Sequence, residues 1–298
     1  MMNPKNVKLA MAPIGWTNDD MPDLGAENTF EQCVSEMALA GYTGSEVGNK
    51  YPKDPAELKR ALEMRGIRIC NQWFSAFLTT RPYADVETEF LRQLDFLAAM
   101  GAEVIGPAEQ GHSVQGLLDV PVLSGKPTFT DEEWDRLTTG LNKLGALALE
   151  RGIRLCYHHH MGTGCQTITE VDRLLENTDP DKVWLLYDTG HFTFSSEDPL
   201  AAVKKYIDRI GHVHLKDIRP EVFRTVQKED MSFLDAVRAG VFTVPGDGSI
   251  DFPAIFRVLE DADYRGWIVV EAEQDPTKAN PLEYAMKARS YIREHTGL

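Results

Sequence analysis

Basic side chains are scarce in this sequence. Its 298 residues include 31 Lys and Arg against 46 Asp and Glu, which gives a formal net charge of −15. Binding to nucleic acid depends on clustered Lys and Arg side chains that neutralise phosphates. The charge balance therefore argues against a nucleic-acid partner.

Cysteines and long apolar runs are also few. No stretch approaches the roughly 20 apolar residues of a membrane span, and the first residues lack the apolar core of a signal peptide. The four cysteines form no C-x-x-C pair, which favours reduced thiols over a disulfide framework. They are Cys33, Cys70, Cys156 and Cys165. We expect a soluble cytoplasmic protein that does not associate with membranes.

Two common active-site signatures are missing. The Gly-Thr-Gly segment at 162–164 lacks the flanking residues of a phosphate-binding Walker loop. No serine stands in the G-x-S-x-G turn of the α/β-hydrolases. Any chemistry must come from other residues.

Short apolar runs alternate with amphipathic helical patterns along the whole chain, which is typical of a parallel sheet with helical crossovers. Eight strands are expected, at 8–14, 44–47, 67–73, 103–107, 153–158, 183–188, 211–216 and 267–271. Eight parallel strands close a barrel, and such a barrel takes about 250 residues. We therefore expect residues 1–298 to form one α/β domain, a single (β/α)8 TIM barrel.

Helix starts are marked by three predicted capping boxes, which begin at Asn28, Thr130 and Thr167 and carry Glu three residues later. Two further helices are expected to begin at Asp198 and Asn280, each followed by Pro at the first helical position. Long connections break this rhythm at 109–130 and 219–251, the second with a short helix over 232–239. Both follow strands, so both are expected over the barrel mouth.

Metal-binding side chains stand at the ends of four expected strands. His158, Asp188, His214 and Glu271 each follow apolar residues. Because the carboxyl ends of barrel strands meet at one mouth, these four groups should converge. Nitrogen and oxygen ligands without thiolate suit Mn²⁺, Co²⁺ or Zn²⁺. His160, two residues beyond His158, is the rival for the first position.

His212, His214 and Lys216 share one face of their strand because side chains alternate with a period of two. His212 is expected to be a core histidine satisfied by the backbone. Lys216 is interpreted as an active-site cation, with a buried ion pair to Asp217 as the alternative. His191, which follows Asp188 by three residues, supports a functional site here.

At these positions the chain resembles the xylose-isomerase-like family of metal-dependent TIM barrels. The segments that carry the resemblance are 12–20 (APIGWTNDD), 157–164 (YHHHMGTG), 185–191 (LLYDTGH), 212–217 (HVHLKD), 242–248 (FTVPGDG) and 266–276 (GWIVVEAEQDP). The family usually places Glu, Asp, His and Glu on strands five to eight. Here the last three fall on Asp188, His214 and Glu271, whereas the first falls on His158.

The resemblance extends to the members that remove water from 2-keto-myo-inositol in myo-inositol catabolism, giving a trihydroxycyclohexane-1,2-dione. It implies Mn²⁺ or Co²⁺ as cofactor, with Zn²⁺ as an alternative, and it links activity to glutathione. It also implies a small-molecule polyol ketone as substrate and a homodimer or homotetramer.

Dehydration needs a base for the α-proton and an acid for the departing β-hydroxyl. The candidates are Lys216, His191, His160 and Glu271. Polyol recognition needs hydrogen-bonding groups and an aromatic face at the mouth. The residues expected to bind substrate are Glu46, Gln72, Trp73, Glu109 and His112.

Other functions are compatible with the same fold. A sugar or inosose isomerase or epimerase is disfavoured because related epimerases use both Glu ligands for proton transfer, and His158 replaces one of them. An apurinic endonuclease is disfavoured by the negative charge. A barrel that binds a polyol or a metal without catalysis is the third alternative function.

Overall fold

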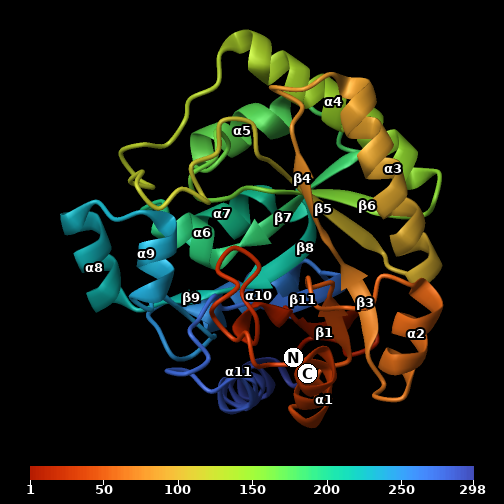
Figure 1. Ribbon diagram of the computed structural model, residues 1–298, viewed down its shortest axis with the longest axis vertical. Coiled ribbons are helices and arrows are strands. Elements are labelled where there is room, and N and C mark those ends of the chain that lie inside the picture. The colour runs from red at the N-terminus through yellow and green to blue at the C-terminus, as the bar shows by residue number, and fades with distance from the viewer.

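Parallel strands surround a central axis in the computed structural model, which describes residues 1–298 (Figure 1). The strands are β1 (Val7–Met11), β2 (Gly44–Glu46), β3 (Arg68–Asn71), β4 (Trp73–Ala76), β5 (Val104–Glu109), β6 (Arg154–His158), β7 (Val183–Asp188), β8 (Ile210–Leu215) and β11 (Gly266–Val270). They pair in the order β3-β2-β1-β11-β8-β7-β6-β5-β4. Every pairing in this sheet is parallel.

The two ends of this order are consecutive in sequence. Only Gln72 separates β3 from β4, and the Gln72 carbonyl accepts the Gly106 N–H of β5 at 3.1 Å. The third expected strand is thus one strand bent at Gln72, and the sheet closes as the predicted eight-stranded barrel. The first strand is shorter than expected, because residues 13–15 form a 3₁₀ turn with Pro13 at its start.

Helices surround the barrel (Figure 1). They are α1 (Phe30–Leu39), α2 (Pro55–Glu63), α3 (Tyr83–Met100), α4 (Asp131–Leu149), α5 (Ile168–Glu176), α6 (Thr189–Phe194), α7 (Pro199–Tyr206), α10 (Phe252–Asp261) and α11 (Pro281–Thr296). A second 3₁₀ turn spans Ile207–Arg209. None of the helices combines the length and the apolar character that crossing a bilayer requires.

Two of the three predicted capping boxes are confirmed. At Thr130 and at Thr167 the hydroxyl accepts the backbone N–H of the residue three positions later. The carboxylate of that residue, a Glu, accepts the backbone N–H of the threonine. The prediction for Asn28 was wrong, because Thr29 caps α1 and accepts the Gln32 N–H at 3.1 Å. The Asn28 amide instead donates to the Trp16 carbonyl at 2.7 Å and holds the loop after β1.

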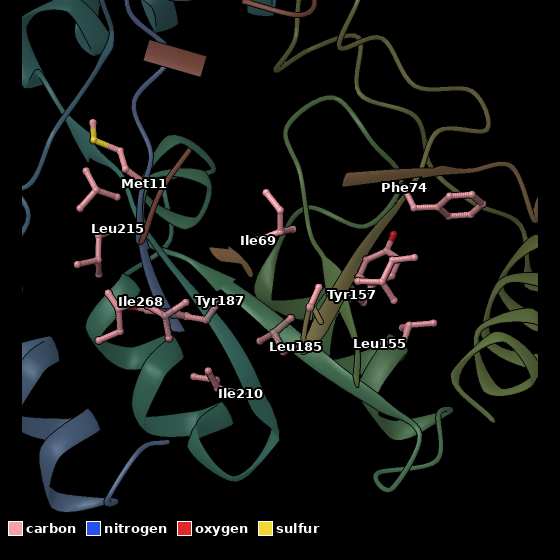
Figure 2. Close-up of a cluster of buried hydrophobic side chains, with 14 of the residues drawn as sticks. Met11, Ile69, Phe74, Leu155, Tyr157, Leu185, Tyr187, Ile210, Leu215 and Ile268 are labelled. Carbon is pink, nitrogen blue, oxygen red and sulfur yellow. The ribbon is translucent and has the colours of Figure 1, made fainter. Parts of the chain in front are cut away.

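The core has two layers, because successive strand side chains point to opposite faces of the sheet. The outer layer, between strands and helices, includes Leu155, Tyr157, Leu185 and Tyr187 (Figure 2). Strand residues that point to the other face of the sheet fill the barrel interior. One cluster there consists of Ala10, Ala12, Cys70, Trp267 and Val269, and a second of Val104, Cys156 and Leu186. The same alternation turns the last residues of several strands toward the barrel mouth.

The segment 219–251 forms a small cap beside the mouth. The expected helix is confirmed as α9 (Phe233–Arg238), but α8 (Pro220–Glu229) and the antiparallel pair β9 (Asp217–Ile218) and β10 (Phe242–Thr243) were not foreseen. In α8, Val222, Phe223 and Val226 recur at helical spacing and pack on the apolar cluster of the cap, a signal in the sequence that was not used. An apolar cluster that includes Phe194, Phe233 and Phe242 joins the cap to α6. The other long connection, 110–130, contains no helix or strand, as expected.

The burial pattern of α4 makes a stability prediction. Leu141 is fully buried in the outer layer, whereas Leu149 at the end of the same helix is 40% exposed. Leu141→Ala should lower the free energy of unfolding by about 2–5 kcal/mol, because it leaves a cavity. Leu149→Ala should change it by about 0.5 kcal/mol or less. Urea titrations followed by circular dichroism compare the two, and equal losses would contradict this description of the core.

Candidate active site

Four strand ends bring His158, Asp188, His214 and Glu271 together in the barrel mouth. His158 Nε2 and His214 Nδ1 each lie 3.6 Å from Asp188 Oδ2. His214 Nδ1 also lies 2.9 Å from Glu271 Oε2. All four side chains are buried. The convergence predicted from the sequence is therefore present in the fold.

Two of the converging atoms, His158 Nε2 and Asp188 Oδ2, have no hydrogen-bond partner, and His214 Nδ1 faces only carboxylate oxygens. Buried polar atoms are rarely left unpaired, so such a group calls for an explanation. Two imidazole nitrogens beside carboxylate oxygens form a donor set that suits a divalent cation. The residues present therefore fit the metal that the fold family implies.

Asp188 serves two purposes at once. Its Oδ1 accepts the His191 N–H at 2.8 Å and caps α6, whereas Oδ2 faces the histidines. The capping bond fixes the carboxylate, so its free oxygen is aimed before any ligand arrives. A helix cap and a metal ligand are thus compatible roles for this residue.

The geometry separates His158 from its rival. His160 Nδ1 lies 3.1 Å from the Met161 carbonyl, which can only accept, so Nδ1 carries the proton. Burial, with the charge of His158, lowers the pKa of His160 well below its ordinary value, and the ring is neutral with a bare Nε2. His158, His214 and Asp188 lie within 4.8 Å of one another by their ligand atoms, a group that does not include His160.

Lys216 is fully buried behind the cluster and compensates its negative charge. Its Nζ lies 2.6 Å from Glu271 Oε1, 3.0 Å from Glu273 Oε2 and 3.9 Å from Asp188 Oδ2. Burial alone would lower the pKa of Lys216, but Glu271 and Glu273 raise it above its ordinary value. The expected alternative, an ion pair with Asp217, is not formed. Asp217 instead accepts backbone N–H groups from residues 218, 246, 248, 249 and 250.

The two glutamates that share Lys216 differ in acidity. Burial alone would raise the pKa of Glu271, yet Lys216 and His214 bring it down to about 2. Burial raises the pKa of Glu273 to about 7, because Lys216 offsets it only in part and the Glu271 charge adds to it. Glu271 is therefore ionised near neutral pH, whereas Glu273 exchanges a proton there.

The remaining histidines surround the cluster. His191 Nε2 lies 3.7 Å from Asp188 Oδ2 and 3.2 Å from Lys216 Nζ, so His191 with Asp188 and Glu271 forms a second group able to hold a cation. Its ring packs 3.9 Å from that of His160. His159 stacks on Phe192 with ring centroids 3.9 Å apart, on the helix side of the sheet. His212 lies in the core as expected, but its Nε2 faces Glu46 Oε1 at 3.2 Å, so its partner is a carboxylate and not the backbone.

A cavity of about 240 Å³ opens above the cluster. Five carboxylates line it, and no Lys or Arg does: the acidic residues are Asp19, Asp20, Glu46, Glu271 and Glu273. His158, His160 and His214 also reach it, but Lys216 and His191 do not. The lining therefore suits an uncharged ligand with many hydroxyl groups better than a phosphorylated one.

The residues expected to bind substrate divide into two groups. Glu46, Gln72 and Trp73 line the cavity, and the Trp73 ring packs edge-on against His158 and His160 at 5.4 and 5.2 Å. Glu109 does not line the cavity, contrary to expectation. Its carboxylate accepts hydrogen bonds from the N–H groups of residues 78, 79 and 111 and from the Thr79 hydroxyl. His112 is exposed and pairs with Glu133 at 2.9 Å.

Several lining residues were not singled out from the sequence. They are Asp19, Asp20, Asn49, Asn71, Gln110 and Gln115. Gln115 Nε2 donates to Asp20 Oδ2 at 3.1 Å, which joins the loop after β1 to the loop after β5 across the mouth. Gln110 directly follows a strand, which was an available signal. Asp19 and Asp20 lie in an irregular loop, and no periodicity marks them.

Known proteins are similar in sequence to this chain over its full length. Residues 34–295 match the family described as Xylose isomerase-like TIM barrel. The chain is 59% identical to an inosose dehydratase of Clostridium tetani over 298 residues and 61% identical to one of Clostridium beijerinckii over 297 residues. Each alignment covers 100% of both proteins.

Among solved structures, the chain is similar to the IolI protein with a bound zinc atom. The TM-score is 0.73 at 15% identity, over 97% of this chain and 98% of that one. This similarity concerns the fold, whereas the full-length identity to the dehydratases concerns the whole sequence. The chain therefore belongs to the xylose isomerase-like TIM barrel family and, within it, to the inosose dehydratases.

Proposed function

We propose that the chain is a hydro-lyase that removes water from 2-keto-myo-inositol (scyllo-inosose) and yields a trihydroxycyclohexane-1,2-dione. Full-length identity to inosose dehydratases supports the reaction. The observation that carries the proposal is a cation-binding donor set at the floor of a cavity lined by hydrogen-bonding groups and free of Lys and Arg. A neutral polyol ketone matches that lining.

A divalent cation held by His158, Asp188, His214 and Glu271 would act as a Lewis acid toward the ketone oxygen and favour loss of the neighbouring proton. The protein side chains must then do three things. They orient the ring, accept the α-proton and return a proton to the β-hydroxyl as it leaves as water.

Two groups in the cavity suit the proton transfers. His160 presents a bare Nε2, because its Nδ1 is committed to the Met161 carbonyl, and it serves as the base. Glu273 serves as the acid: its Oε2 is bound by Lys216 at 3.0 Å and its side chain lines the cavity. The proton that leaves carbon is taken up by His160, and the C–O bond breaks as Glu273 protonates the hydroxyl.

Lys216 and Glu271 have a supporting part in this scheme. Lys216 does not line the cavity, and its ammonium lies between carboxylates. Glu271 has one oxygen toward Lys216 and the other toward His214. Neither has an atom free for the substrate proton. Lys216 keeps the carboxylates in place, and His191 supports it from behind.

The finer assignments follow the family resemblance. We propose Mn²⁺ or Co²⁺ as the physiological cation, with Zn²⁺ as the alternative, and a stimulation by glutathione. We also propose that residues 1–298 act as one domain in a cytoplasmic homodimer or homotetramer. The loops that meet over the mouth, including the cap at 219–251, would close over the substrate.

The proposed reaction is tested with metal-free protein and 2-keto-myo-inositol. No turnover is expected until Mn²⁺ or Co²⁺ is added. The dione absorbance should then grow, and mass spectrometry should show the loss of one water. A product of unchanged mass would indicate an isomerase or epimerase instead, and no turnover with any of the three cations would contradict the substrate assignment.

Glu273→Gln tests the acid. The substitution keeps the shape and the contact to Lys216 but removes the transferable proton. We expect kcat to fall by about 10²–10⁴, the usual contribution of one proton-transfer group, with a small change in KM. Glu294→Gln, on the exposed face of α11, is the control. A kcat within twofold of the parent protein would remove Glu273 from the mechanism.

Lys216→Met tests the buried cation. Three carboxylates would lose their counter-charge, so turnover should fall far more than substrate affinity. The free energy of unfolding should drop by about 3–5 kcal/mol, because a buried charge is left unpaired. Steady-state kinetics and urea unfolding measure the two effects, with the exposed Lys204→Met as control. Unchanged turnover would show that the charge is not needed.

A further inference from the structure

Glu46 is held from three sides in the barrel interior. Its Oε1 accepts from Asn71 Nδ2 at 2.7 Å, His212 Nε2 at 3.2 Å and His214 Nε2 at 2.9 Å. The residue is 8% exposed. All three donors meet Oε1, so this oxygen is committed to the barrel interior, whereas Glu46 also lines the cavity. The Oε1 contacts point to a role beyond the substrate binding expected from the sequence.

The reach of Glu46 across the barrel depends on the layer below it. β2 has the sequence Gly44-Ser45-Glu46, so Gly44 and Glu46 share a face. A Cβ on Gly44 would lie 2.3 Å from the Trp267 ring, so only glycine admits that ring into the lower interior. The Glu46 side chain then extends over this layer toward β8, where His212 and His214 stand.

The contact fixes the state of the His214 ring. Because a carboxylate can only accept, the Nε2 atom that faces Glu46 carries a proton. The other nitrogen, Nδ1, then turns toward Asp188 Oδ2 at 3.6 Å and Glu271 Oε2 at 2.9 Å. Without a cation Nδ1 meets the Glu271 carboxylate, and with a cation bound it would be the nitrogen that ligates. The ring thus offers its second nitrogen to the centre of the donor cluster.

We propose that Glu46 is a positioning residue for the cation site: it holds His214 in the tautomer and orientation that present Nδ1 as a ligand. The inference rests on the cation site of the proposed function. Histidine ligands commonly donate their other N–H to a carboxylate, which fixes the ring and raises its basicity. Asn71 and His212 in turn fix the Glu46 oxygen.

The affinity of the purified protein for Co²⁺ alone tests the inference without reference to catalysis. Competition with a coloured chelator gives Kd, and the visible absorption of bound Co²⁺ reports the ligand geometry. Glu46→Gln should bind Co²⁺ about 10–100-fold more weakly than the parent protein, the usual effect of losing such a partner. It should keep the same stoichiometry and show a shifted visible band.

Two further variants calibrate the result. Asn71→Ala removes one of the three donors to Glu46 and should weaken Co²⁺ binding by a smaller factor. Glu103→Gln changes a carboxylate that pairs with Lys8 and lies away from the donor cluster, and it should leave Kd unchanged. A defect in folding would lower the fraction of protein that binds, whereas a defect in positioning raises Kd at full stoichiometry.

Each contrary outcome has a distinct meaning. Parent-like Co²⁺ affinity in Glu46→Gln would overturn the inference and leave the proposed function standing. Loss of Co²⁺ as complete as in His214→Ala would also overturn it, because Glu46 would then be a ligand itself. A parent protein that binds no Co²⁺ would overturn both this inference and the cation site of the proposed function.

Discussion

Closure of the parallel sheet is the constraint on which the rest of this structure depends. Inside a closed barrel each strand contributes only alternate side chains, and the interior has a fixed width. The lower interior holds Ala10, Cys156 and Leu186 together with the Trp267 ring, which Gly44 accommodates. The upper interior holds ionisable groups farther along three of these strands, namely His158, Asp188 and Glu271. Core and site are therefore successive layers of one alternating pattern.

The upper layer is possible because its charges are compensated inside the protein. Asp188, Glu271 and Glu273 surround one ammonium group, that of Lys216. Glu46 is compensated separately, by two imidazoles and an amide. An isolated buried carboxylate would lose its charge or unfold the site. The arrangement keeps carboxylates ionised beside the donor atoms and leaves the cavity surface without a cation.

This arrangement also distinguishes the chain within its family. Where the family pattern would place a Glu on β6, this chain has His158, so the paired glutamates of the sugar epimerases are absent. The cavity groups left with atoms free for proton transfer are of two different kinds, an imidazole and a carboxyl. Such asymmetry suits a reaction in which one proton is removed from carbon and another is delivered to oxygen.

The sequence by itself determined the eight strands, the helix starts at Thr130 and Thr167, and the strand ends that carry His158, Asp188, His214 and Glu271. These features are local: they depend on alternation, on cap residues and on which residue ends an apolar run. The helix start at Asn28 was misplaced by one residue, because a tertiary contact to the Trp16 carbonyl uses that side chain.

The tertiary structure alone decided which groups face the cavity. Lys216 and His160 both stand near strand ends, yet only the packing of the barrel places the first behind the carboxylates and the second in the cavity wall. Glu109 was expected at the mouth, but its carboxylate accepts backbone N–H groups from the loop after β4 and from its own loop. Asp19 and Asp20 reach the cavity from an irregular loop that crosses the mouth. Contacts between segments far apart in sequence leave no periodic trace, so the fold could be predicted from the sequence and the roles of these side chains could not.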